Sequence, residues 1–172
     1  MLTKPQDVVV ALKLCLGAEG ESYAELGQSL GMSASEVHAA VRRLEDARLV
    51  DAGTREVRRE ALCKFLVHGV PFAFPVHAQE VTRGLPTAWA APVMADKFQA
   101  AEQIPPVWPD PNGKVQGAAV RPLYPSVPGA ARRDSALYAL LALVDALRLG
   151  RARERQFAET KLSQLLKDHV AA

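Results

Sequence analysis

Residues 22–36 read SYAELGQSLGMSASE and place two helix starts around one tight turn. Ser22 with Glu25, and Ser33 with Glu36, have the S-x-x-E spacing at which a hydroxyl and a carboxylate satisfy the first free backbone N–H groups of a helix. Gly31 suits the left-handed position that ends the first helix. Two short helices joined by a tight turn containing glycine are typical of the helix-turn-helix, whose second helix lies in the major groove of DNA.

The second helix has one apolar side and one polar side. Val37, Val41 and Leu44 recur at helical spacing and predict the buried side. The opposite side carries the residues that we expect at base edges: Ser35, His38, Ala39 and Arg42. Arginine can bind guanine with two hydrogen bonds, serine and histidine can donate to bases or phosphates, and alanine can contact a thymine methyl. The alternative is that this side is only the solvated face of a core helix.

Three segments carry a resemblance to a known family: the helical stretch 5–16, YAELGQSLGMS at 23–33, and EVHAAVRRLEDARLV at 36–50. Over roughly the first third of the chain, they resemble winged helix-turn-helix regulators of bacteria and archaea, such as the MarR-like group. In that family a basic wing after the second helix contacts DNA. Residues 51–55 leave room for only a short wing, since Val57 to His68 predicts a new helix. Residues expected nearer phosphates are Ser33, Arg43, Arg55, Arg58 and Arg59.

Charge is a weak guide to the partner. The net charge is +2, and residues 1–68 hold nine Lys and Arg against ten Asp and Glu. DNA affinity must then come from local arrangement, mainly the six arginines between Arg42 and Arg59. The sequence predicts a sequence-specific DNA-binding transcriptional regulator, in particular a homodimeric repressor bound to double-stranded DNA. The alternative is a protein-interaction module, such as an antitoxin-like subunit that binds a partner protein.

The middle of the chain, residues 69–133, differs from both ends. Eleven of the twelve prolines lie between Pro71 and Pro128, which excludes a long helix there. Seven of the ten aromatic residues lie in this segment or at its edge, so we expect it to pack on the helices. Asp110-Pro-Asn-Gly113 predicts a turn, and residues 107–109 and 114–116 around it predict a small hairpin.

From Asp134 the chain returns to helical patterning behind an Asp134-Ser135 cap, with a second helix from about Arg151. The apolar stripe of the first of these helices is wider than one helix needs, and related winged proteins commonly dimerise through such helices. The residues expected to make the dimer are Leu137, Leu140, Leu141, Val144 and Leu147. The alternative is that these helices pack only on the Pro-rich segment of their own chain.

The predicted fold is mainly α (α+β) in three parts. These are a winged-helix-like DNA-binding domain with a shortened wing in 1–68, a Pro-rich irregular segment with a small β-hairpin in 69–133, and a C-terminal helical pair in 134–172.

The remaining signals exclude several classes. The sequence lacks phosphate-binding, nucleophile-elbow and metalloprotease motifs, so we expect neither an enzyme nor a cofactor. Cys63, His68 and His77 have irregular spacing, and no metal site is expected. Asp7 and Lys13 interrupt the first apolar run, and no span of about 20 apolar residues occurs. We therefore expect a cytoplasmic protein with no membrane partner.

Overall fold

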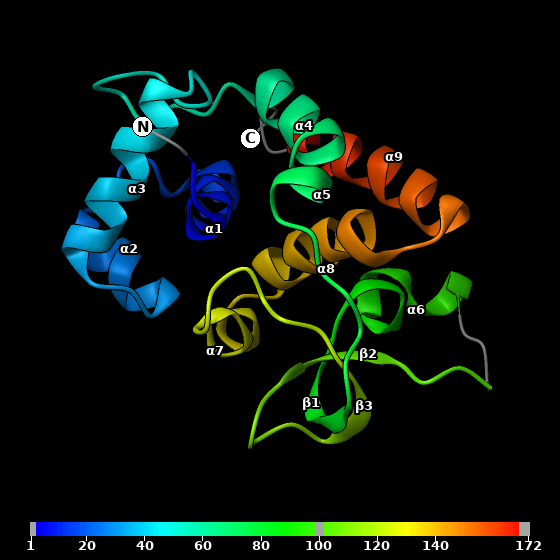
Figure 1. Cartoon of the computed structure of the whole chain (residues 1–172). Coiled ribbons are helices and arrows are strands. Elements are labelled where there is room, and N and C mark those ends of the chain that lie inside the picture. The colour runs from blue at the N-terminus through cyan, green and yellow to red at the C-terminus, as the bar shows by residue number, and fades with distance from the viewer. Residues whose placement is uncertain (1–2, 99–101, 169–172) are drawn as a thin grey trace.

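The computed structural model describes residues 3–98 and 102–168 and is mainly helical with one small sheet (Figure 1). The helices are α1 Pro5–Lys13, α2 Tyr23–Leu30, α3 Ala34–Asp46, α4 Arg59–His68, α5 Val70–Ala73, α6 Pro92–Phe98, α7 Val127–Arg133, α8 Ser135–Leu149 and α9 Ala152–Asp168. Two short helical turns are η1 Leu14–Ala18 and η2 Ala88–Ala90, and the strands are β1 Val81–Pro86, β2 Pro106–Pro109 and β3 Val115–Ala119. The α+β class is confirmed.

Helix α8 runs through the middle of the molecule and contacts α1, α4, α5, α6, α7 and α9 (Figure 1). The Asp134 carboxylate caps it by accepting the Leu137 N–H at 3.1 Å, as expected. Its apolar residues face several directions, and a helix that is hydrophobic all round is buried. At most 4% of the surface is exposed at each of the residues expected to make a dimer, Leu137, Leu140, Leu141, Val144 and Leu147. That assignment is wrong, because one chain already fills the surroundings of these side chains.

Helices α2 and α3 and the turn between them, here called the capped pair, form as the local sequence predicts. Ser22 Oγ accepts the Glu25 N–H at 3.1 Å, and Glu25 Oε2 accepts the Ser22 N–H at 2.7 Å. The same reciprocal bonds join Ser33 and Glu36 at 3.2 and 2.7 Å. Gly31 ends α2 at φ 70°, in the left-handed region. Both capping boxes are therefore confirmed.

The turn of the capped pair is also held from outside. Ser126 Oγ donates to the Leu30 carbonyl at 2.6 Å, and Arg133 of α7 donates to the Ser29 carbonyl at 3.0 Å. These two bonds satisfy carbonyls that a helix end leaves free. Helix α2 is thus anchored at its C-terminal end on α7.

The strands differ from the expected hairpin. The turn itself is confirmed, since the Gly113 N–H donates to the Asp110 carbonyl at 2.9 Å. However, β2 and β3 run parallel, with Pro106 opposite Ala118, and β1 pairs antiparallel with both. A Cβ on Gly113 would lie 2.5 Å from the Cα of Gly84 in β1. The turn therefore folds back against β1 and does not project as a hairpin tip.

A buried polar contact joins this sheet to α8. Trp108 Nε1 and the Thr87 hydroxyl donate to Asp145 Oδ2 at 2.6 and 2.7 Å, and Arg148 donates to Asp145 Oδ1 at 2.8 Å. Asp145 is 1% exposed, and burial raises the pKa of its carboxyl. The Pro-rich segment is thus tied to the same core as the helices.

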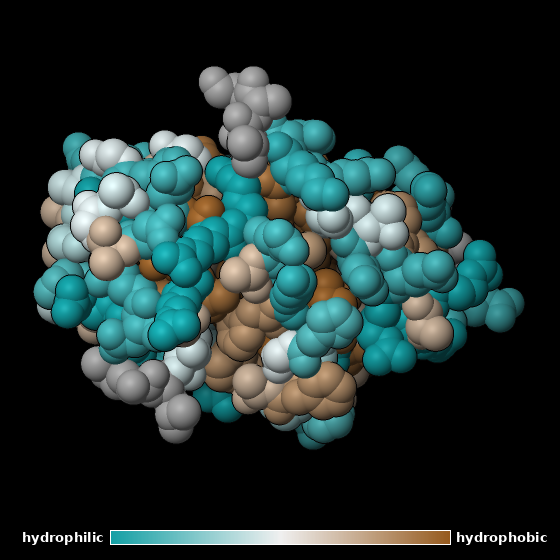
Figure 2. All heavy atoms as spheres, turned by 90° about the horizontal axis from the view of Figure 1, so that it is seen from above, coloured by the Kyte–Doolittle hydropathy of each residue, from teal (hydrophilic) through white to brown (hydrophobic). Residues whose placement is uncertain are grey.

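The surface seen from above is mostly hydrophilic, with apolar atoms showing along the middle of this face (Figure 2). One cluster of buried side chains draws on all three parts of the sequence, for example Leu12, Trp108 and Leu141. None of the helices in the described ranges combines the length and the apolar character that a membrane crossing requires.

Candidate nucleic-acid interface

Helix α3 presents the two sides that its sequence predicts. Val37, Val41 and Leu44 are at most 1% exposed. Ser35, His38 and Arg42 are exposed on the other side, and Ala39 is half-buried beside them. The side chains expected at base edges therefore do share one accessible face.

A second segment stabilises the N-terminal turn of α3. The Tyr124 hydroxyl donates to Glu36 Oε1 at 2.6 Å, across 88 positions of sequence. This bond and those from Ser33 hold the pKa of the Glu36 carboxyl below its usual value, and the carboxylate in turn raises the pKa of Tyr124. Ser33 and Ser35 approach each other with their hydroxyl oxygens 3.1 Å apart. Ser33 is thus already engaged as a cap, whereas Ser35 lies further out on the exposed turn.

A row of three neighbouring side chains runs from the turn after α3 across to the exposed face, with its two rings tilted by 53° to each other. The Arg55 guanidinium lies 5.0 Å from the Tyr23 ring centroid, and the Tyr23 ring lies 4.9 Å from that of His38. Arg55 also donates to the Glu21 carbonyl at 2.7 Å. His38 therefore packs against the Tyr23 ring of α2. Arg55 lies against the same ring, and part of the Arg55 side chain is open to solvent.

Arg42 is the most accessible cation on this face. Its side chain is 61% exposed, and its guanidinium pairs with Glu45 at 3.1 Å, one turn further along α3. An exposed pair of this kind contributes about 0–1 kcal/mol, so a stronger partner can replace Glu45. Arg42 can thus swing to a base edge or a phosphate.

Arg43, expected near phosphates, is instead buried. It is 5% exposed, and its guanidinium donates to both carboxylate oxygens of Asp7 on α1 at 2.7 and 2.8 Å. The hydrogen bond to Asp7 raises the pKa of Arg43 further. The sequence contains a signal for this pair: Asp7 directly precedes the apolar run of α1, and a buried carboxylate needs a cation. Arg43 is removed from the interface.

Of the last two arginines expected near phosphates, Arg59 differs from expectation and Arg58 does not. Val50 and Val57 form one antiparallel bridge, and the helix expected from Val57 begins at Arg59. Arg59 donates to the carbonyls of Cys15 and Leu166 at 2.9 Å each, so it joins the ends of two other helical segments and does not face outward. Arg58 is half exposed and pairs with Asp51. Only Arg58 of these two lies where a phosphate could reach it.

Two aromatic residues of this region were missed at the level of sequence. Tyr23 begins α2 directly after its cap, and its position next to a predicted helix start is the one local signal for it. Tyr124 has no such signal, because the residue that it contacts is far away in sequence.

Carboxylates also lie among the arginines, so this surface offers directed hydrogen bonds more than a uniformly positive field.

The candidate metal ligands Cys63, His68 and His77 do not come together, as no group of three or more suitable ligands occurs within the described ranges. Cys15 is buried, which raises its pKa to about 12, while Cys63 is half-buried.

Comparisons of the chain with protein-family models, curated proteins and solved structures found no match.

Proposed function

We propose that this chain is a sequence-specific DNA-binding transcriptional regulator that reads double-stranded DNA with α3. The observation that carries the proposal is the exposed, polar N-terminal half of α3. It follows a tight turn between two helices that each begin with a capping box, as in a helix-turn-helix. In such motifs the N-terminal residues of the second helix contact base edges. The one-bridge hairpin between Val50 and Val57 then serves as a minimal wing.

The contacts follow from what each exposed side chain can donate. Arg42 gives two parallel N–H donors, which match the O6 and N7 acceptors of guanine. His38 and Ser35 are exposed and supply hydrogen bonds to bases or phosphates, and Ala39 beside them contacts a thymine methyl. Arg55 and Arg58 lie nearer the backbone of the DNA.

The test begins with selection of binding sites from random double-stranded DNA, followed by titration of the chosen site. Arg42→Ala should weaken binding by about 1–3 kcal/mol and relax the preference at one base pair. The matched control is Arg153→Ala, an exposed arginine of α9 far from the capped pair in sequence, which should change neither. Failure to select any site, or an unchanged preference in Arg42→Ala, contradicts the proposal.

A second candidate function is binding of a partner protein through the same face. It is favoured by the pairs Arg42–Glu45 and Arg58–Asp51, which offset two of the cations that a phosphate backbone would need. Salt dependence separates the two functions, since affinity for DNA falls steeply with salt in proportion to the phosphates contacted. A partner that co-purifies, binds in reconstitution and is lost in Arg42→Ala, with no DNA affinity at low salt, favours the second function.

The homodimer remains part of the first proposal, although its surface is not the stripe of α8. Two copies bound to half-sites one helical turn apart would double the sequence that is read. Light scattering of the protein alone and with its selected site tests this point, and a single copy per site contradicts it.

A further inference from the structure

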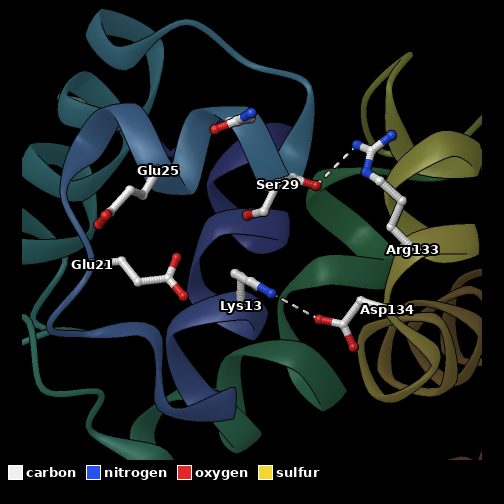
Figure 3. A pocket seen from close by; sticks show the side chains of 7 residues that line it. Lys13, Glu21, Glu25, Ser29, Arg133 and Asp134 are labelled. Atoms are coloured by element: carbon white, nitrogen blue, oxygen red, sulfur yellow. Dashed lines mark hydrogen bonds and ion pairs between the residues drawn. The ribbon is translucent and has the colours of Figure 1, made fainter.

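A pocket of about 530 Å³ lies between the capped pair and the junction of α7 with α8 (Figure 3). Lys13 of α1 and Glu21 and Ser29 around α2 form one side, and Arg133 and Asp134 form the other. Their side chains converge on this space from segments that are more than 100 positions apart in sequence. Each residue that lines the pocket has a polar or charged side chain, and the charged groups have both signs.

The charges of the pocket are unevenly satisfied. Lys13 Nζ and Asp134 Oδ2 are 2.8 Å apart and neutralise each other. Glu21 is half-buried, and within residues 3–98 and 102–168 its carboxylate has no hydrogen bond or ion pair, although its carbonyl accepts from Arg55. Arg133 uses one N–H, toward the Ser29 carbonyl, and keeps its other donors. Glu25 also lines the pocket, and its Oε2 accepts the Ser22 N–H. Among the charged lining residues of the described ranges, Glu21 is thus the carboxylate without a hydrogen-bond partner, and Arg133 is the cation without a carboxylate partner.

We propose that this pocket binds a small zwitterion of the amino-acid type. Figure 3 shows Glu21 and Arg133 on opposite sides of the pocket, with Lys13 between them. The ligand's ammonium donates to the Glu21 carboxylate and can also donate to Ser29 Oγ, whose own proton goes to the Leu26 carbonyl. The ligand's carboxylate accepts from Arg133 and from the remaining protons of Lys13, and charge-assisted bonds of this kind are the stronger ones.

The bound zwitterion also acts on the capped pair. Arg133 helps to hold the C-terminal end of α2, and a carboxylate bound to its remaining donors restrains the guanidinium and so changes this anchor. Because α2 ends at the turn into α3, a changed anchor shifts how α3 is held. Control of DNA binding by the ligand rests on the proposed function, whereas the binding of the ligand does not.

The experiment measures binding by calorimetry on the full chain without DNA. The probes are the free L-amino acids, β-alanine and γ-aminobutyrate, each compared with acetate and ethylamine, which carry only one of the two charges. At least one zwitterion should bind saturably. Glu21→Gln and Arg133→Gln should each weaken that binding by about tenfold or more, because each leaves one ligand charge without its partner. Glu56→Gln and Arg153→Gln, exposed residues outside the pocket, should leave it unchanged.

Circular dichroism first establishes whether each variant is folded. If Arg133→Gln is unfolded, the affinity of the Glu21→Gln variant alone tests the proposal. The proposal is overturned if no zwitterion binds saturably, if acetate or ethylamine binds as well, or if Glu21→Gln retains full affinity. Titration of selected DNA with and without the ligand is a separate measurement. Ligand binding to a protein that has no DNA affinity upholds the pocket and removes only the proposed function.

Discussion

Replacing Arg43 by Met should be among the most damaging single changes on α3, although a sequence reading assigns this residue to the surface. The side chain is buried and forms two bonds of 2.7 and 2.8 Å to Asp7, which is itself 0% exposed. Removing one partner of a buried ion pair costs about 3–5 kcal/mol, because the other charge remains buried and uncompensated. The free energy of unfolding of a domain is about 5–15 kcal/mol, so this loss is a large fraction of the total stability.

Urea unfolding followed by circular dichroism measures this loss directly. In thermal unfolding, each kcal/mol corresponds to about 2–4 °C for a chain of this size, so the midpoint should fall by about 6–20 °C. Arg42→Met is the matched control. Arg42 is the neighbouring arginine, its side chain is 61% exposed, and its pair with Glu45 contributes about 0–1 kcal/mol. The double change Asp7→Asn with Arg43→Met should recover part of the loss, since it removes both charges. An Arg43→Met protein that is as stable as Arg42→Met refutes the burial of this pair.

Three further predictions concern the packing around the capped pair and α8. Leu141→Glu should unfold the chain and not release folded monomers, because the new carboxylate would be buried in the chain's own core. Loss of the helical circular dichroism signal checks this, and a folded monomer would contradict it. Gly27→Ala should lower the free energy of unfolding, measured with urea, by about 1–3 kcal/mol, because its Cβ would lie 2.4 Å from a carbonyl of the turn. The control is Gly20→Ala, whose Cβ meets nothing within 4 Å, and equal losses in the two variants would be inconsistent with this packing. Tyr124→Phe should raise the pKa of Glu36 toward its usual value in an NMR titration. Because the lowered pKa stabilises the folded state at pH values above the usual one, the variant should be less stable than the wild type near neutral pH. This difference should shrink as the pH falls through the lowered value and vanish at the lowest pH; an unmoved pKa argues against the hydrogen bond.

Elements whose bonds close within a few residues were predictable from sequence. The two capping boxes join residues three apart, and the cap of Asp134 on α8 does the same. The left-handed residue at Gly31 and the turn at Asp110 follow from the same short range. The sidedness of α3 follows from its periodicity, so the exposed face with His38 and Arg42 could also be found.

Longer contacts decided what the sequence could not. Whether an arginine on the margin of α3 faces water or α1 depends on Asp7, 36 positions away, and whether the stripe of α8 faces a second copy depends on which helices its own chain packs around it. The same holds for the strand order, where β1 lies against both β2 and β3 because the turn at Gly113 folds onto Gly84. Local hydrogen bonds are set by spacing along the chain, whereas burial and ion pairing are set by which segments meet, and that meeting is a property of the whole packed core.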